Sequence, residues 1–145
     1  MAFHFSLQKV MELKEREKKE GQSIYSKAVD DFEQKATILY NLLKSKESLE
    51  DNARNRIQTG ITIGDIQQQQ SQFLRLQEEI NKQQVKTQIA RNNMQKKQQE
   101  LVERTIEFKK YQKMKELKHT AYEQEQTHLE NVLMDEMSVL MYSKR

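Results

Sequence analysis

The chain has 145 residues, of which 35% are apolar and 32% are charged, and its net charge is +3. It contains no cysteine, which excludes a disulfide framework and every thiolate site. A compact globular domain is nearer half apolar, so a large enclosed core is excluded as well. The polar residues are mostly Glu, Lys, Gln and Arg, all good helix formers, and the composition therefore predicts an all-α protein.

The first predicted element is a long helix over about residues 6–58. The chain has no proline, so nothing in this segment breaks a helix. A heptad frame places apolar residues at positions a and d, and four lysines interrupt that row. The apolar residues are Leu7, Met11, Tyr25, Ala28, Phe32, Leu39, Leu42, Leu49 and Ala53, and the interruptions are Lys14, Lys18, Lys35 and Lys46. A row with this 3.5-residue period predicts a weak coiled-coil seam.

A turn is predicted at residues 59–64, which contain two of the three glycines. Gly60 suits the position just after a helix, where a positive φ costs glycine little. Thr62 can cap the N-terminus of the next helix, and Asp65 favours the positive end of that helix. Because the loop is so short, the two helices are expected to be antiparallel neighbours.

The second predicted element is a helix over about residues 65–141. Eight of its eleven a positions are apolar: Ile66, Phe73, Ile80, Met94, Leu101, Phe108, Tyr122 and Leu129. Residues 81–100 have few apolar side chains, so the packing is expected to be loosest there. The sequence thus predicts one elongated domain spanning residues 1–145, a long antiparallel two-helix coiled coil with an overhanging C-terminal helix.

The overhang follows from the unequal lengths of the two helices. A reversal at residue 61 or 62 places Phe5 opposite Lys118 and leaves residues 119–141 without a partner over roughly 35 Å. The overhang is nevertheless rich in apolar residues: Tyr122, Leu129, Val132, Leu133, Met134, Met137, Leu140 and Met141. Each apolar side chain left in water forgoes roughly 1.5–3 kcal/mol, so either the helices bend to cover the overhang or another protein does.

The sequence offers no catalytic, cofactor or metal site. The three glycines are too scattered for a phosphate-binding loop, and His4, His119 and His128 are too far apart for a compact metal site. We therefore expect no enzymatic activity and no cofactor. No apolar run approaches the ~20 residues that span a bilayer, and no signal-peptide core follows the first residue, which favours a soluble, intracellular protein.

Charge is unevenly distributed along the second helix. Residues 81–118 carry eleven Lys or Arg against four acidic residues, whereas residues 119–137 carry five acidic residues and no Lys or Arg. The basic stretch could meet an acidic protein, an anionic membrane surface or nucleic acid. A protein that binds single strands usually interleaves aromatic residues on the charged face, but Phe108 and Tyr111 fall in the seam. We therefore expect no nucleic-acid partner, and a nucleic-acid-binding hairpin is the weakest alternative.

A second group of apolar residues lies in the half of the hairpin that is next to the turn. It comprises Ile38, Leu39, Tyr40 and Leu43 from the first helix and Phe73, Leu74, Leu76 and Ile80 from the second. Two interpretations remain open for this group. It is either a wide packed stripe or a contact face for a partner.

Three stretches stand out by their order and spacing. They are Phe3-His-Phe5-Ser-Leu7-Gln-Lys-Val10 with Glu12-Leu13-Lys14-Glu15, Asp31-Phe32-Glu33 with Leu39-Tyr40, and Gly60-Ile-Thr-Ile-Gly-Asp65-Ile66. In this order they resemble the flagellar export protein family FliJ of Gram-positive bacteria. The likeness covers essentially the whole chain in length, turn position and spacing.

The resemblance implies a non-enzymatic stalk of the flagellar type III export apparatus, similar to the γ stalk of rotary ATPases. It implies three partners: the flagellar export ATPase hexamer, the cytoplasmic domain of the export gate protein, and export chaperones. It also implies a cytoplasmic protein, peripheral at the inner face of the cell membrane near the flagellar base, with a link to motility and chemotaxis.

Mapped onto this chain, the resemblance suggests two contact sets. The export-ATPase set is Phe3, Phe5, Leu129, Leu133, Met137, Leu140 and Met141, and the export-gate set is Leu39, Tyr40, Leu43, Phe73, Leu76 and Ile80. The alternative to a dedicated stalk is a general coiled-coil adaptor or chaperone, whose terminal apolar residues hold client proteins.

Overall fold

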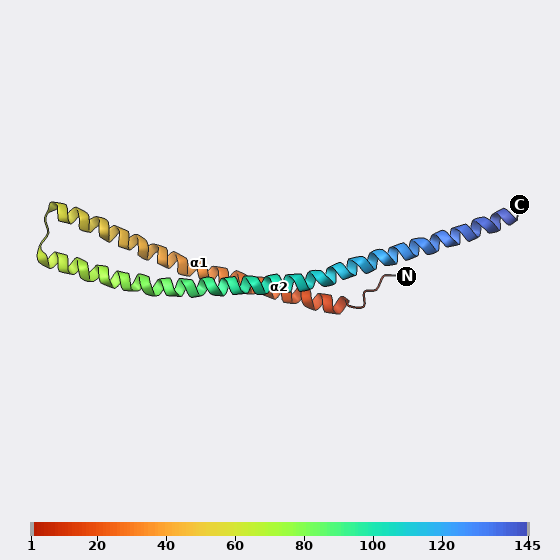
Figure 1. Cartoon of the computed structure of the whole chain (residues 1–145), viewed down its shortest axis with the longest axis horizontal. Helices are drawn as coiled ribbons and strands as arrows, with labels where there is room; N and C mark the ends of the chain where they lie inside the picture. Colours follow the sequence, from red (N-terminus) through yellow and green to blue (C-terminus); the bar gives the residue numbers. More distant parts are fainter. Residues whose placement is uncertain (1, 145) are drawn as a thin grey trace. The chain divides into compact units, whose positions relative to one another are not determined.

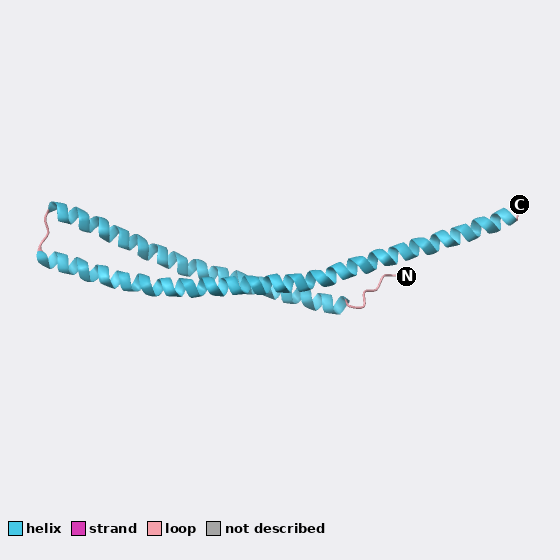
Figure 2. Ribbon diagram, viewed as in Figure 1, coloured by secondary structure: helices cyan, strands magenta, loops and turns pink. Residues whose placement is uncertain are grey.

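The structure, a computed structural model, describes residues 2–144 and consists of two helices (Figure 2). Helix α1 spans Gln8–Thr59 with 52 residues, and helix α2 spans Ile63–Ser143 with 81 residues. No strand occurs within the described residues. The fold is an all-α helical hairpin, which confirms the predicted fold class.

The connection between α1 and α2 is a three-residue turn over residues 60–62. Gly60 has a φ of 97°, a value that L side chains rarely adopt, as predicted for the residue after a helix. The hydroxyl oxygen of Thr62 accepts a hydrogen bond from the backbone N–H of Asp65 at 3.2 Å, and the Thr62 carbonyl accepts one from Ile66 at 3.1 Å. Thr62 is therefore the N-cap of α2.

The N-terminal segment, residues 2–7, lies outside α1. The helix begins at Gln8, two residues later than predicted, and the Gln8 N–H donates to the Phe5 carbonyl at 3.1 Å. The Met11 N–H donates to the Leu7 carbonyl at 2.9 Å, which sets the first helical turn. The segment therefore leads into α1 through a turn that leaves Phe3 and Phe5 free to pack elsewhere.

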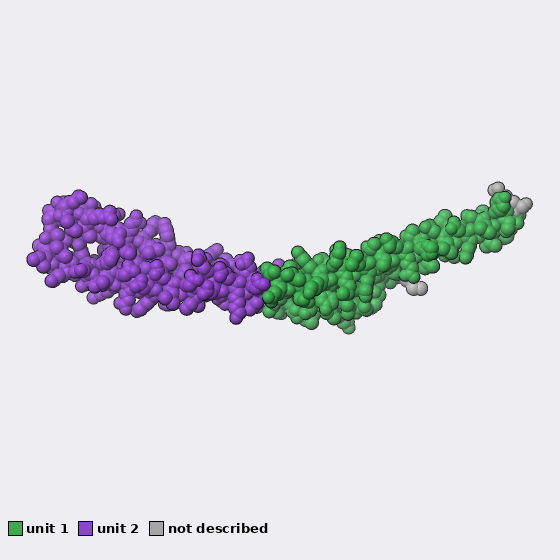
Figure 3. Space-filling view, in the orientation of Figure 1, with its two compact units in different colours: residues 1–20, 102–145 green, residues 21–101 purple. Residues whose placement is uncertain are grey.

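The described residues form two compact units (Figure 3). We call residues 21–101 the turn unit, because it contains the connection between the helices. We call residues 2–20 and 102–144 the terminal unit. Each unit pairs one stretch of α1 with one stretch of α2.

In the turn unit, α2 contacts α1 in the predicted antiparallel register. The Gln83 side-chain amide and the Thr87 hydroxyl both donate to the Lys35 carbonyl, at 3.1 and 3.3 Å. The guanidinium of Arg91 lies 5.6 Å from the centre of the Phe32 ring. Residues of α1 that are closer to the turn therefore contact residues of α2 that are also closer to the turn. The core is small: Ala28, Ile80 and Ala90 are the buried apolar residues of this unit.

The polar interruptions of the seam have structural partners. The amine of Lys46 lies 5.6 Å from the centre of the Phe73 ring, and that of Lys18 lies 5.1 Å from the Phe108 ring. Lysine can run its methylene stem along an apolar surface and place its ammonium group over an aromatic face. The lysines therefore contribute to the helix interface, and every a and d position from Leu7 to Ala53 is at least partly buried.

The expectation that packing is loosest at residues 81–100 was wrong. Gln83 and Ala90 in that stretch are 7% and 4% exposed. The open space lies instead beside the turn, where Leu49, Ala53 and Ile66 line a cavity. Figure 3 shows an opening in this end of the turn unit. The amide of Gln83 closes the gap between the helices by hydrogen bonding, which the sequence pattern did not reveal.

Candidate partner-binding surface

The C-terminal part of α2 carries an extended apolar surface. We call residues 123–143 the tail. Within the terminal unit no other helix lies alongside it (Figure 1), and every side chain from Thr127 to Ser143 is exposed. The large apolar side chains of the tail are 39–80% exposed: Leu129, Val132, Leu133, Met134, Met137, Val139, Leu140, Met141 and Tyr142.

Part of the apolar surface of the tail lies on a single face of α2. Leu129, Leu133, Met137 and Leu140 follow one another at intervals of three or four residues, so they share one face. Tyr122, seven residues before Leu129, lies on the same face and is partly buried. The tail therefore continues, uncovered, the face of α2 that is covered up to Tyr122.

Phe3 and Phe5, predicted as ATPase contacts, pack within the chain. Phe5 is 4% exposed, and the amine of Lys118 lies 5.8 Å from its ring centre, the pairing predicted from the reversal. The Phe3 ring meets His119 edge-on, with ring centres 4.9 Å apart, and lies 5.5 Å from the Tyr122 ring. The two phenylalanines thus anchor the N-terminal segment, and the exposed part of the predicted set is in the tail.

The predicted export-gate set is divided between the interior and the surface. Ile80 is 1% exposed, and Leu39, Phe73 and Leu76 are partly buried. The ring of Tyr40 is 57% exposed, with the amine of Lys44 5.1 Å from its centre, and Leu43 is 43% exposed. Leu74, which was not in the set, is 66% exposed. The heptad frame accounts for this division between buried and exposed residues, since Leu39 and Ile80 occupy a positions at the interface between the helices.

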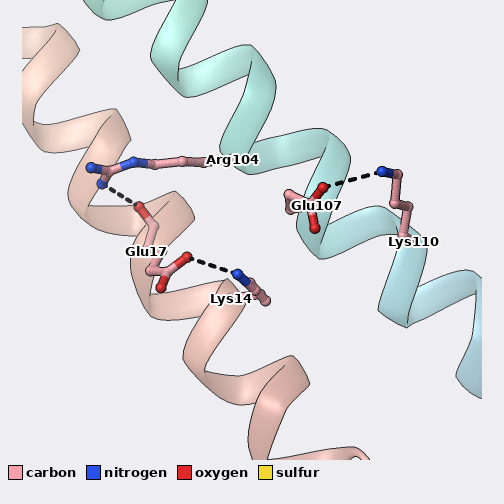
Figure 4. Close-up of polar contacts among 5 residues, drawn as sticks. All are labelled: Lys14, Glu17, Arg104, Glu107 and Lys110. Carbon is pink, nitrogen blue, oxygen red and sulfur yellow. Dashed lines mark hydrogen bonds and ion pairs between the residues drawn. The ribbon is translucent and has the colours of Figure 1, made fainter.

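Basic side chains in the terminal unit are engaged in contacts of the chain's own. Arg104 donates to the Glu17 carbonyl on α1 at 2.9 Å, and the carboxylate of Glu17 lies 3.5 Å from the amine of Lys14 (Figure 4). Lys110 pairs with Glu107 of the same helix at 3.1 Å (Figure 4). Arg104 therefore positions the two helices of this unit, and the basic stretch is partly committed to the fold.

Two other kinds of site have no candidate within the described residues. Over residues 2–144, no group of three or more His, Asp or Glu residues is arranged to hold a metal ion. In the same residues, neither helix has a stretch apolar enough to cross a membrane. The fold defines a helical-hairpin coiled-coil protein, and the exposed apolar side chains of the tail are its candidate partner-binding surface.

Comparison with known proteins gives the family. The sequence model of the flagellar FliJ protein family matches residues 3–145. The chain is 34% identical to the flagellar FliJ protein of Bacillus subtilis strain 168 over 142 residues, which are 98% of this chain and 97% of that protein. The chain belongs to the flagellar FliJ family. It is accordingly a component of flagellar protein export, in a family of non-enzymatic export components.

A solved structure has the same fold. The YscO homologue CT670 of Chlamydia trachomatis superimposes with a TM-score of 0.66, covering 98% of this chain and 96% of that one. The two sequences are 18% identical. At that identity the likeness establishes the helical-hairpin fold.

Proposed function

We propose that the chain is a coupling component of the flagellar type III export apparatus, which links the export ATPase hexamer to the export gate and to substrate chaperones. It acts by binding and catalyses no reaction. It works in the cytoplasm, at the inner face of the membrane near the flagellar base. Family membership supports the export role, and two exposed surfaces support the linkage.

The observation that carries the proposal is the uncovered apolar face of the tail. Leu129, Leu133, Met137, Leu140 and Met141 are each about half exposed or more. Burial of one such side chain against a partner is favourable by roughly 1.5–3 kcal/mol, so a helix end of this kind is a strong contact element. We assign it to the export ATPase.

The second contact, with the cytoplasmic domain of the export gate, is assigned to the surface around Tyr40 and Leu43 in the turn unit. Both side chains are exposed on α1, whereas Ile80 is enclosed between the helices. An aromatic side chain with an exposed face is a frequent anchor in protein interfaces. Leu39, Phe73 and Leu76 then support this surface from within the seam.

The test measures binding to the cognate export ATPase. A tail variant carries Leu129→Gln, Leu133→Gln, Met137→Gln and Leu140→Gln, since glutamine keeps helix propensity and removes the apolar surface. A matched control carries four equally exposed positions of the turn unit, Ile57→Gln, Leu74→Gln, Val85→Gln and Ile89→Gln. We expect the tail variant to lose ATPase binding by about tenfold or more, and the control to keep it.

Two results would contradict the assignment. One is unchanged ATPase binding, hexamer formation and hydrolysis with the tail variant. The other is suppression of aggregation of unrelated denatured proteins by the wild-type chain, lost in the tail variant, which would favour a general adaptor or chaperone. A dedicated coupling component should give no such suppression.

A further inference from the structure

A carboxylate lies within the apolar face of the tail. The helix-surface neighbours of Glu136, three and four residues away on either side, are Val132, Leu133, Val139 and Leu140, all apolar. Glu136 also lines a surface groove together with Val132, Asp135, Val139 and Leu140. Glu136 thus lies among apolar residues and not on the polar side of an amphipathic helix, where acidic residues are usually found.

Glu125 lies eleven residues earlier, and its neighbours at three and four residues are Ala121, Tyr122, His128 and Leu129. Eleven residues are close to three helical turns, so the two carboxylates project from nearly the same side of α2. Tyr122 and Leu129 lie three residues before and four residues after Glu125, on the covered face and its uncovered continuation. Both acidic side chains are therefore placed where a helix packed on the tail would lie.

The interface between α1 and α2 has a charge pattern opposite to that of the tail. Its charged a and d positions between Leu7 and Tyr122 are all basic: Lys14, Lys18, Lys35, Lys46, Arg56, Lys97, Arg104, Lys115 and Lys118. Lys18 and Lys118 lie over aromatic rings, and Arg104 donates to a backbone carbonyl. Lys14, Lys35 and Lys97 instead pair with carboxylates of their own helix. The tail has carboxylates at such positions, and residues 119–143 contain no Lys or Arg to pair with them.

A carboxylate covered by a partner is costly unless a cation or hydrogen-bond donor meets it. A second tail would bring carboxylates against carboxylates, and an anionic membrane would repel them. We propose that the tail binds an amphipathic helix carrying two basic side chains within its apolar stripe, eleven residues apart, to meet Glu125 and Glu136. This inference rests on the proposed function only in taking the tail as the partner-binding surface.

The proposal is tested with two synthetic peptides. Both are amphipathic helices with leucine at a and d; one has lysine at a d position and at the a position eleven residues later, and its twin has glutamate there. Binding to the fluorescently labelled full chain is followed by anisotropy at low salt. We expect the lysine peptide to bind about tenfold or more tightly than the glutamate twin. That preference should decrease as salt is added.

A charge reversal makes the test specific. The double variant Glu125→Lys and Glu136→Lys should reverse the preference, so that it binds the glutamate peptide more tightly. The control, Glu123→Lys with Glu130→Lys, changes the net charge equally at two tail positions outside the a and d rows and should keep the wild-type preference. Circular dichroism verifies that the helix content of both variants is unchanged.

Three outcomes would overturn the proposal: equal binding of the two peptides, an equal effect of the control variant, or tail-dependent binding to phosphatidylglycerol vesicles with no peptide preference. The test also distinguishes failure of this inference from failure of the proposed function. If the ATPase binds the wild type but the two peptides bind equally, the inference fails and the proposed function stands. If the lysine peptide binds as expected and the ATPase does not, the proposed function fails and the inference stands.

Discussion

Arg104 on α2 donates a hydrogen bond to the backbone carbonyl of Glu17 on α1, with 2.9 Å between Nη1 and the oxygen. The carboxylate of Glu17 in turn faces Lys14 at 3.5 Å. A polar residue at a seam position of a coiled coil often specifies register, because only one alignment satisfies it. Arg104 thus has this role in the terminal unit, as Gln83 has in the turn unit through its hydrogen bond to Lys35.

We predict that Arg104→Met destabilises the fold by about 1–2 kcal/mol, because methionine keeps the apolar stem and removes the donor. Guanidinium chloride unfolding followed by circular dichroism measures the change. Arg75→Met is the control, since Arg75 is exposed and should change stability by less than about 0.5 kcal/mol. Equal effects of the two substitutions would argue that Arg104 has no positioning role.

The second prediction concerns Ile80, which is 1% exposed in the turn unit. Ile80→Ala should cost about 2–4 kcal/mol, the sum of lost burial and the cavity left behind. Ile89, on the same helix, is 63% exposed, and Ile89→Ala should cost less than about 0.5 kcal/mol. Both values come from the same unfolding measurement. A small loss for Ile80→Ala would mean that the two helices do not form a stable interface there.

Most of the fold could be predicted from the sequence, because helix formation and heptad pairing depend on local patterns. The absence of proline, the glycine at residue 60 and the cap at Thr62 determine the two helices and the turn. The interface chemistry was harder to predict. Whether Lys18 is solvated or lies over Phe108 depends on register and rotamer, which residue type does not specify.

The candidate site, too, could be predicted from the sequence only in part. The uncovered tail could be predicted from helix lengths alone, and its five predicted contact residues are exposed. The position of Phe5 opposite Lys118 could also be predicted from the reversal. The edge-on packing of Phe3 against His119 could not, because it depends on a non-helical segment whose path has no periodic signal. The glutamates of the tail could have been found from their apolar neighbours at three and four residues.

The third prediction compares two glycines of the turn region. Gly60 has a φ of 97°, so Gly60→Ala should destabilise the protein by about 1 kcal/mol although the space around it is open. Gly64 lies in the first turn of α2, where a methyl group would also enter open space, and Gly64→Ala should stabilise the protein by about 0.5–1 kcal/mol. Thermal unfolding of both variants checks the opposite signs, and shifts of the same sign would contradict the turn conformation.

The fourth prediction tests the anchor of the N-terminal segment. Phe5→Ala removes a ring that is 4% exposed and in contact with Lys118, so residues 2–7 should detach from α2. Hydrogen exchange of the first turn of α1 should accelerate at least about fivefold, corresponding to about 1 kcal/mol or more of lost local stability. Tyr40→Ala is the control, since that ring also lies near a lysine but is 57% exposed, and it should leave exchange in α1 nearly unchanged.

The last prediction separates the two proposed surfaces. Tyr40→Ala with Leu43→Ala should weaken binding to the cytoplasmic domain of the export gate by about tenfold and leave ATPase binding unchanged, because both side chains are exposed and far in sequence from the tail. The glutamine variants of Leu129 and Leu133 should do the reverse. Titration calorimetry with each partner measures both effects, and circular dichroism verifies that the helices are intact. If one pair of substitutions weakens both interactions equally, the two partners share a surface and the assignment of separate surfaces is wrong.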